Sequence, residues 1–313
     1  MTIPEPLNDT ISVDGVRLQT LDWGGNGPAL VFLAGYANTP HFLDAVARSF
    51  TSRFRVLGLS RRAHGTSDQP EDGYDIPTLA HDIVALLDAY GIERASFVGH
   101  SFAGHEMCQL AAALSARVGK LVFLDALYRT EEGDAALFAE NPLPPSAPPP
   151  ETFESVAAYC ADFVARYPTY RRLRSPRWDA LWALGLERTS EGRLRERIRP
   201  ETASKLSEGR NAFRPDYAAI RCPVLAFYAF QDESWSLPDG SDNVLREAMK
   251  EHVKRVNTRY KRRCIERARG EIADIEIVEF ENTSHYCFLD READVVEAMR
   301  RFLRAPLQGG SIE

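Results

Sequence analysis

The sequence predicts an α/β fold in which helices cover both faces of a mostly parallel, eight-stranded sheet. Three observations support this. Short apolar runs of strand length alternate with amphipathic helical segments, the alternation breaks once at a proline-rich stretch, and it then resumes to near the end of the chain. The predicted strands cover residues 10–13, 16–23, 29–33, 54–59, 95–98, 120–124, 223–228 and 275–280.

The first two strands are predicted to form a hairpin, because Asp14-Gly15 suits a tight turn that needs positive φ. The strands that follow are continuous apolar runs, such as Ala29-Leu-Val-Phe-Leu33, as expected for parallel strands that are buried on both faces. Gly91 is placed to end the helix that precedes it. Helices are predicted over residues 41–50, 80–90, 102–114, 242–269 and 292–303.

The alternation stops after residue 126. Residues 141–150 contain six prolines in ten positions, which forbids a helix or a central strand there. From residue 153 to 198 the apolar spacing is helical, with a stripe that includes Trp178 and Trp182. We therefore predict one core, formed by residues 1–126 and 219–313, and an inserted, mostly helical cap over residues 127–218, called the cap segment below.

Composition and charge exclude several classes of protein. The 313 residues are 44% hydrophobic and 27% charged, an ordinary mixture for a globular protein and not for a disordered one. The net charge is −7, although residues 166–221 hold 14 Lys and Arg against 7 Asp and Glu. That block, like residues 246–269, lacks the interleaved glycines and aromatics of an RNA-binding surface. We interpret both as solvated helical faces and expect no nucleic-acid partner.

The sequence also bears on the cellular compartment. No apolar run approaches the ~18 residues of a membrane helix, and residues 1–10 lack the basic and then apolar pattern of a signal segment. The five cysteines form no CxxC pair, and their odd number argues against a disulfide framework. We expect a reduced, cytoplasmic protein without a membrane partner.

The strongest chemical signal is Gly99-His100-Ser101-Phe102-Ala103, between a predicted strand and a predicted helix. A serine on such a sharp turn holds its hydroxyl clear of both elements, and small neighbours let the two backbones approach. The stretch resembles the nucleophile elbow of the α/β-hydrolase superfamily, with Ala103 where the last glycine is usual. The resemblance implies an α/β-hydrolase fold with a helical cap and Ser101 as the nucleophile.

In that superfamily the acid and the base follow the serine in chain order. His285, directly after the last predicted strand, resembles the superfamily's catalytic histidine. Asp232, after strand 223–228 and ahead of Pro238, resembles its usual acid. Asp125, at the end of strand 120–124, is the alternative acid, because some members of the superfamily take the acid from that position. We predict Asp232.

The stretch Leu33-Ala34-Gly35-Tyr36 is similar to the superfamily's oxyanion loop, where His-Gly and a large residue are usual. Gly35 would let the backbone approach the substrate, and the N–H groups of Tyr36 and Phe102 are the expected oxyanion donors. Residues 59–68 resemble the superfamily's loop after the fourth strand, which we interpret as structural.

These residues predict a serine hydrolase that acts on an ester, a lactone or a related small acyl compound through an acyl-enzyme. No cofactor is expected and no metal, because no histidine pairs with cysteine or carboxylate at a metal-ligand spacing. Four aromatic residues of the cap segment are candidates to line the substrate pocket, or alternatively to form the core of the cap. They are Tyr159, Phe163, Trp178 and Trp182.

Two other kinds of function remain open from sequence. The same scaffold supports carbon–carbon bond hydrolysis, aminopeptidase action and hydroxynitrile lyase chemistry. The second kind of function is that of a hydrolase-like sensor, which captures a small ligand without turning it over. Turnover of an ester distinguishes an enzyme from such a sensor.

Overall fold

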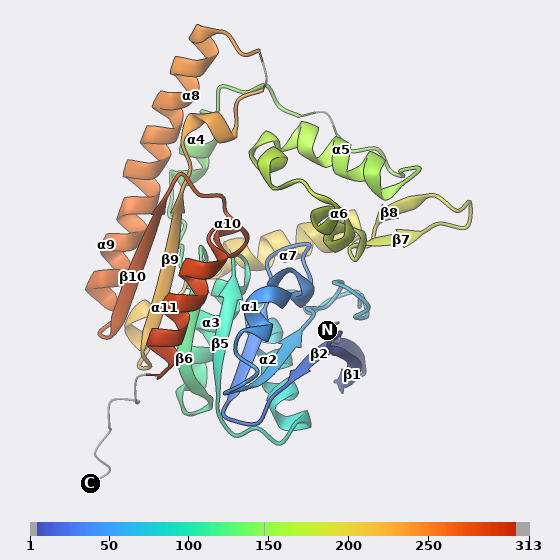
Figure 1. Ribbon diagram of the computed structural model, residues 1–313, viewed down its shortest axis with the longest axis vertical. Coiled ribbons are helices and arrows are strands. Elements are labelled where there is room, and N and C mark those ends of the chain that lie inside the picture. Colours follow the sequence, from blue (N-terminus) through green and yellow to red (C-terminus); the bar gives the residue numbers. More distant parts are fainter. Residues whose placement is uncertain (1–4, 147, 239, 305–313) are drawn as a thin grey trace.

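The computed structural model describes residues 5–146, 148–238 and 240–304 (Figure 1). Its main sheet has eight strands in the order β1-β2-β4-β3-β5-β6-β9-β10. β1 and β2 run antiparallel, as do β2 and β4, and the remaining neighbours are parallel. The strands are β1 (Leu7–Val13), β2 (Val16–Gly24), β3 (Ala29–Leu33), β4 (Arg55–Leu59), β5 (Ala95–His100), β6 (Val118–Leu124), β9 (Val224–Phe230) and β10 (Ile275–Glu281). The predicted mostly parallel sheet is confirmed.

Successive side chains of the central strands point to opposite faces of the sheet, and each face carries its own core. Val31 of β3 packs with α2, α3 and α9 on one face. Leu30 and Phe32 of the same strand pack with α1 and α11 on the other. The helices are α1 (Asp44–Arg48), α2 (Ile76–Ala89), α3 (Ala103–Ala113), α9 (Arg262–Glu271) and α11 (Glu292–Arg304). These two layers explain why the strands lack polar alternation.

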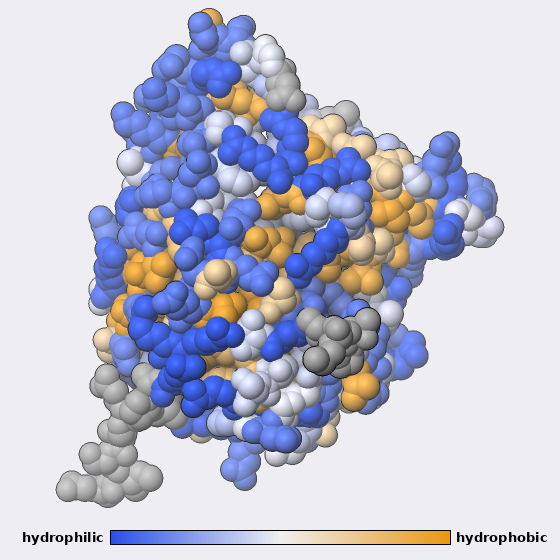
Figure 2. Space-filling model, viewed as in Figure 1, coloured by the Kyte–Doolittle hydropathy of each residue, from blue (hydrophilic) through white to orange (hydrophobic). Residues whose placement is uncertain are grey.

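Three predicted helices differ in detail from the structure. The predicted helix 41–50 is a 3₁₀ turn η1 (Pro40–Leu43) followed by the short helix α1. α2 begins four residues before the predicted start, because Asp75 Oδ1 accepts a hydrogen bond from Thr78 N at 2.9 Å and caps the first turn. The predicted helix 242–269 is α8 (Asn243–Val256), a π-helical turn η6 (Asn257–Lys261) and α9. Figure 2 shows hydrophilic side chains over the outer face of α8, at the upper left.

The segment between β6 and β9 holds the helices α4 (Asp134–Ala139), α5 (Val156–Arg166), α6 (Pro176–Ala183) and α7 (Pro200–Ala212). It also holds a two-stranded hairpin that the sequence did not predict, β7 (Leu186–Arg188) with β8 (Leu194–Glu196). Gly192, with φ at +78°, lies in the turn between these strands. Charged residues dominate both strands, so the period of two that marks a half-buried strand is missing. α5, α6 and the hairpin lie above the sheet in Figure 1.

One of the contacts between this segment and the core involves the loop after β9. The 3₁₀ turn η3 (Pro168–Leu173) packs against the loop after β9, which holds the 3₁₀ turn η5 (Glu233–Trp235). Arg172 Nη2 donates to Ser234 Oγ at 2.8 Å, and its guanidinium carbon lies 4.7 Å from the centre of the Trp235 ring.

All five cysteines are buried and free of disulfide bonds. None of the helices in the described ranges has both the length and the apolar character needed to cross a membrane.

Candidate active site

Ser101 occupies a strained turn between β5 and α3. Its φ is +54°, a left-handed value that is uncommon for a residue with a side chain. The turn is possible because its neighbours are small. A Cβ on Gly99 would lie 2.2 Å from the sulfur of Met107, and one on Gly104 would lie 2.0 Å from the carbonyl oxygen of Ala126. Ala103, in place of the usual glycine, is fully buried within this turn.

His285 lies in the loop between β10 and α10 (Cys287–Asp290). Its Nδ1 is 2.6 Å from Oδ2 of Asp125. The backbone on either side is held in place, because His100 Nε2 donates to the carbonyl oxygen of His285 at 3.0 Å and Ser284 N donates to Oδ2 of Asp290 at 2.7 Å. The imidazole is therefore fixed at the carboxyl edge of the sheet.

The predicted pairing of His285 with Asp232 is wrong, and Asp125 takes that position. Oδ1 of Asp232 instead accepts hydrogen bonds from the backbone N of Ser234, at 2.9 Å, and from the Ser234 hydroxyl. It thereby caps the turn η5 within its own loop. Asp125 follows β6 with φ at +47°, and this left-handed conformation leaves its carboxylate against the histidine.

The carboxylate of Asp125 is held on both oxygens. Oδ1 accepts hydrogen bonds from Ala229 N, at 2.9 Å, and from the hydroxyl of Tyr128, while Oδ2 faces His285. Burial alone would raise the pKa of Asp125, but the charge of Lys261 and the hydrogen bond from His285 outweigh it and hold that pKa at about 2. Asp125 is therefore ionised and accepts the Nδ1 proton of the imidazole. Sequence reasoning missed Tyr128 and Lys261.

The loop after β3 approaches the serine closely. A Cβ on Gly35 would lie 3.1 Å from Cβ of Ser101 and 2.9 Å from Nδ1 of His100, so only glycine fits there. Tyr36 and Phe102, the expected oxyanion donors, line one cavity of about 470 Å³ together with Ser101 and His285. The structure thus brings these four predicted residues together.

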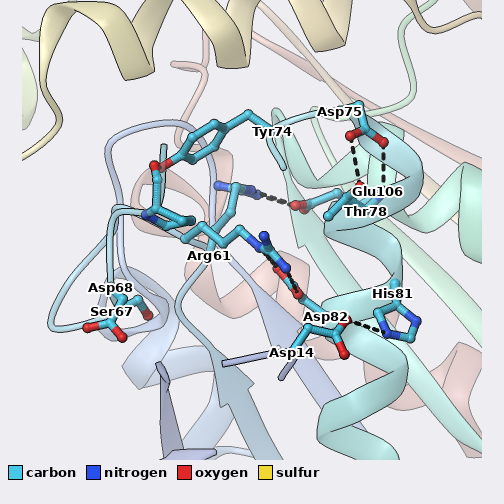
Figure 3. Close-up of polar contacts among 12 residues, drawn as sticks. Asp14, Arg61, Ser67, Asp68, Tyr74, Asp75, Thr78, His81, Asp82 and Glu106 are labelled. Carbon is cyan, nitrogen blue, oxygen red and sulfur yellow. Dashed lines mark hydrogen bonds and ion pairs between the residues drawn. The ribbon is translucent and has the colours of Figure 1, made fainter. Parts of the chain in front are cut away.

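A buried ion pair holds this loop. Arg61 donates to Glu106 through Nε, at 2.5 Å, and through Nη2, at 2.7 Å (Figure 3). The same guanidinium donates to the carbonyl oxygens of Ala34, at 3.0 Å, and Gly35, at 3.4 Å. The guanidinium of Arg61, which the carboxylate of Glu106 on α3 holds in place, therefore positions the backbone just before Tyr36.

His64 supports the next residue of the loop. Its Nδ1 donates to the carbonyl oxygen of Arg62 at 2.8 Å, so Nε2 accepts from Ala37 N at 3.1 Å. Burial lowers the pKa of His64 to about 3, so the ring is neutral and keeps this acceptor. Residues 59–68, interpreted from sequence as structural, carry both supports of the loop.

A glutamine at position 106 tests the ion pair. Glu106→Gln leaves the buried guanidinium of Arg61 without a carboxylate, which is expected to cost ~3–5 kcal/mol of the free energy of unfolding. We also expect kcat to fall about tenfold or more, because the Ala34 and Gly35 carbonyls lose a fixed partner. Urea unfolding and ester kinetics measure the two effects.

The matched control is Asp82→Asn, which breaks the buried pair between Asp82 and Arg62. It should lower stability by a similar amount and leave kcat of the folded protein near that of the parent. Equal losses of kcat in the two variants would contradict a positioning role for Glu106.

Comparison with known proteins identifies the family of the chain. Residues 30–298 match the model of the alpha/beta hydrolase family. The chain belongs to the alpha/beta hydrolase family. Among solved structures, the crystal structure of E-2-(acetamidomethylene)succinate hydrolase matches with a TM-score of 0.71 at 20% identity, covering 96% of this chain and 100% of that one. This likeness shows the fold.

Curated relatives of this alpha/beta hydrolase match over shorter stretches. A non-heme chloroperoxidase of Streptomyces lividans is 37% identical over 117 residues, 36% of this chain and 42% of the relative. Esterase YbfF of Escherichia coli is 33% identical over 111 residues, 35% of this chain and 43% of that protein. The chain spans less than half the length of these two relatives.

The cap aromatics of this alpha/beta hydrolase lie away from the cavity that holds Ser101. Trp178 and Trp182 are buried at 2% and 5% exposure, and both pack edge-to-face on Phe42 of the core. Tyr159 and Phe163 pack against Trp182 in the same cluster. The four candidate pocket residues therefore form the core of the cap segment, the alternative that the sequence left open, and Tyr159 and Trp182 also line a small neighbouring cavity with Tyr36. The apolar periodicity of a helix predicts which side chains are buried, but it does not tell whether they pack against the protein or against a substrate.

Proposed function

We propose that the protein is a cofactor-free serine hydrolase that acts on a carboxylic ester, a lactone or a related small acyl compound. The observation that carries the proposal is the 2.6 Å contact of His285 Nδ1 with Asp125, in one cavity with Ser101 on its left-handed turn. Nucleophile, base and orienting acid are the three parts that a serine hydrolase needs.

In the proposed reaction, Asp125 fixes the tautomer of His285 in which Nδ1 carries the proton. Nε2 is then free to take the proton of the Ser101 hydroxyl as its oxygen attacks the carbonyl. The backbone N–H groups of Tyr36 and Phe102 stabilise the oxyanion of the tetrahedral intermediate. The imidazolium returns its proton to the leaving group, and water attacks the acyl-enzyme by the same route.

The proposal extends to partner and compartment. A small acyl compound is favoured over nucleic acid because arginines of the cap segment pair with neighbouring carboxylates, as Arg174 does with Asp179 and Arg195 with Glu187. Five free thiols fit a reducing compartment, and we propose the cytoplasm.

Two measurements on the same preparation test the function. We expect turnover of short-chain p-nitrophenyl esters and covalent labelling of Ser101 by a fluorophosphonate probe, located by mass spectrometry of the labelled peptide. Labelling without turnover of any ester would favour the sensor, and labelling at another serine would contradict the assignment of the nucleophile.

The activity should fall in acid with a single-proton step. An imidazolium at position 285 cannot accept the serine proton, and histidine is the side chain whose charge ordinarily changes between about pH 5 and 8. The other histidines near the cavity do not titrate in that range. Burial lowers the pKa of His64 to about 3 and of His105 to about 4, and it holds the pKa of His100 well below its usual value.

The acid limb of kcat/KM measures this prediction, because its slope against pH should be one. A slope of two would mean that a second group must lose a proton, which contradicts a mechanism with a single catalytic base.

A further inference from the structure

A cationic side chain lies in the lining of the catalytic cavity. Arg210, near the end of α7, lines it together with Ser101 and His285, and its neighbour Asn211 does so as well. Both residues are exposed, so they lie where the cavity meets solvent. Nε and Nη2 of Arg210 donate to Oδ1 of Asn211 at 3.2 and 3.0 Å.

The charge of Arg210 lacks a counter-charge. Some arginines of the cap segment have one, as in the pairs of Arg166 with Asp162 and Arg174 with Asp179, whereas Arg188 donates to a backbone carbonyl instead. Across residues 5–146, 148–238 and 240–304, no carboxylate lies within ion-pair distance of Arg210, and its side-chain partner is the neutral amide of Asn211. No carboxylate of the described residues therefore balances the positive charge of this guanidinium at the cavity.

This charge acts on groups beside the nucleophile. Burial raises the pKa of Tyr36 to about 12, and Arg210 opposes that rise. Burial lowers the pKa of His105 to about 4, and Arg210 is among the charges that lower it further. Arg210 is therefore close to the oxyanion loop and to the first turns of α3. The carboxylate in the cavity, Asp125, is engaged by His285.

Several other residues that line the cavity are aromatic. Tyr260, from the π-helical turn η6, stacks on Tyr128 with ring centres 5.5 Å apart and packs edge-to-face on Phe138. All three line the cavity. Ser101 thus shares the cavity with an aromatic cluster and a lone guanidinium.

We propose that Arg210 and Asn211 form a carboxylate-binding subsite, so that the substrate is an acyl compound with a carboxylate remote from the bond that is cleaved. This proposal rests on the proposed function. A carboxylate oxygen takes the place of the Asn211 amide oxygen on the Nε–Nη2 edge, and its charge strengthens both hydrogen bonds. The amide NH₂ of Asn211 is then free to donate to the second oxygen.

Matched esters test the subsite. para-Acetoxybenzoate is compared with para-acetoxybenzamide, and mono-p-nitrophenyl adipate with p-nitrophenyl hexanoate, so that the carboxylate lies on either side of the cleaved bond. In at least one pair, Arg210→Gln should lower kcat/KM for the carboxylate ester about tenfold, mainly through KM, and leave the neutral ester within about twofold.

The control is Arg188→Gln, which removes the same charge from another exposed arginine of the cap segment, whose guanidinium donates to the carbonyl oxygen of Gly192 in the turn between β7 and β8. It should leave both ratios unchanged. Equal losses for carboxylate and neutral esters in Arg210→Gln would overturn the subsite, because they are what a role at the C-terminal end of α7 predicts. Equal effects of the two variants would also overturn the subsite.

A binding measurement separates this proposal from the proposed function. Calorimetry with the Ser101→Ala variant compares para-acetamidobenzoate with para-acetamidobenzamide. We expect tighter binding of the carboxylate, lost in the Ser101→Ala, Arg210→Gln double variant. If the carboxylate binds more tightly in this way while the parent cleaves no ester, the proposed hydrolase function is wrong and the proposed subsite stands. Equal binding of the two amides overturns the subsite whatever the turnover.

Discussion

Ser101→Ala is expected to abolish ester turnover and leave the fold intact. The hydroxyl of Ser101 is the nucleophile of the proposed reaction, and no neighbouring group replaces it. What remains is the effect of binding and of the oxyanion donors, on the order of 10³–10⁴ over the reaction in water. Alanine has a Cβ as serine does, so the strained φ of +54° is equally tolerated. Single-turnover kinetics and circular dichroism measure the two parts.

The control is Ser115→Ala, in the exposed turn η2 (Ser115–Arg117), which should keep full activity. A folded Ser101→Ala protein with the parent's kcat would end the serine-hydrolase proposal.

The second large effect is expected from Asp125→Asn, which should lower kcat on the order of 10³–10⁴-fold. An amide at this position keeps an oxygen for Ala229 N but presents an NH₂ group to His285, which then adopts the other tautomer. Nε2 would carry a proton and could not accept one from Ser101. Asp232→Asn should change kcat only a few-fold, because an amide oxygen still accepts from Ser234 N.

The pair of variants is isosteric, so packing is preserved and kcat on one good ester reports the chemistry. The reverse order of losses would return the acid to the loop after β9. Comparable, small losses in both variants would mean that neither carboxylate orients the base.

The core of the fold was predictable because its signal is local. A strand buried on both faces is an apolar run whichever neighbour it pairs with, so β3 and β6 are visible in their own residues. The proposed nucleophile and base were found through their resemblance to the superfamily's motifs, because each lies in a short turn after such a run. The π-helical turn η6 was not predictable, because the residues around it keep the apolar spacing of a continuous helix.

The acid was not predictable from its neighbours. β6 and β9 are adjacent and parallel, so Asp125 and Asp232 leave the sheet at the same edge. The choice between them depends on a left-handed φ at Asp125 and on a serine two residues after Asp232 that occupies its carboxylate. The support of the oxyanion loop was missed likewise, because Arg61 and Glu106 are 45 residues apart in the chain.

In the proposed triad the acid follows β6, so the loop over residues 231–238 holds no reacting group. It instead helps to attach the cap segment to the core. Thr169 Oγ1 donates to Oε1 of Gln231 at 3.0 Å, and Arg171 donates to the carbonyl oxygen of Leu237 at 2.6 Å. Mutations at the positions that hold the cap segment are therefore expected to move it, whereas Trp235 of the same loop donates to Oδ1 of Asn282, in the loop that carries His285. A mutant library for altered substrate range can therefore vary Gln231 and Leu237, which contact the cap segment, and keep Trp235 unchanged.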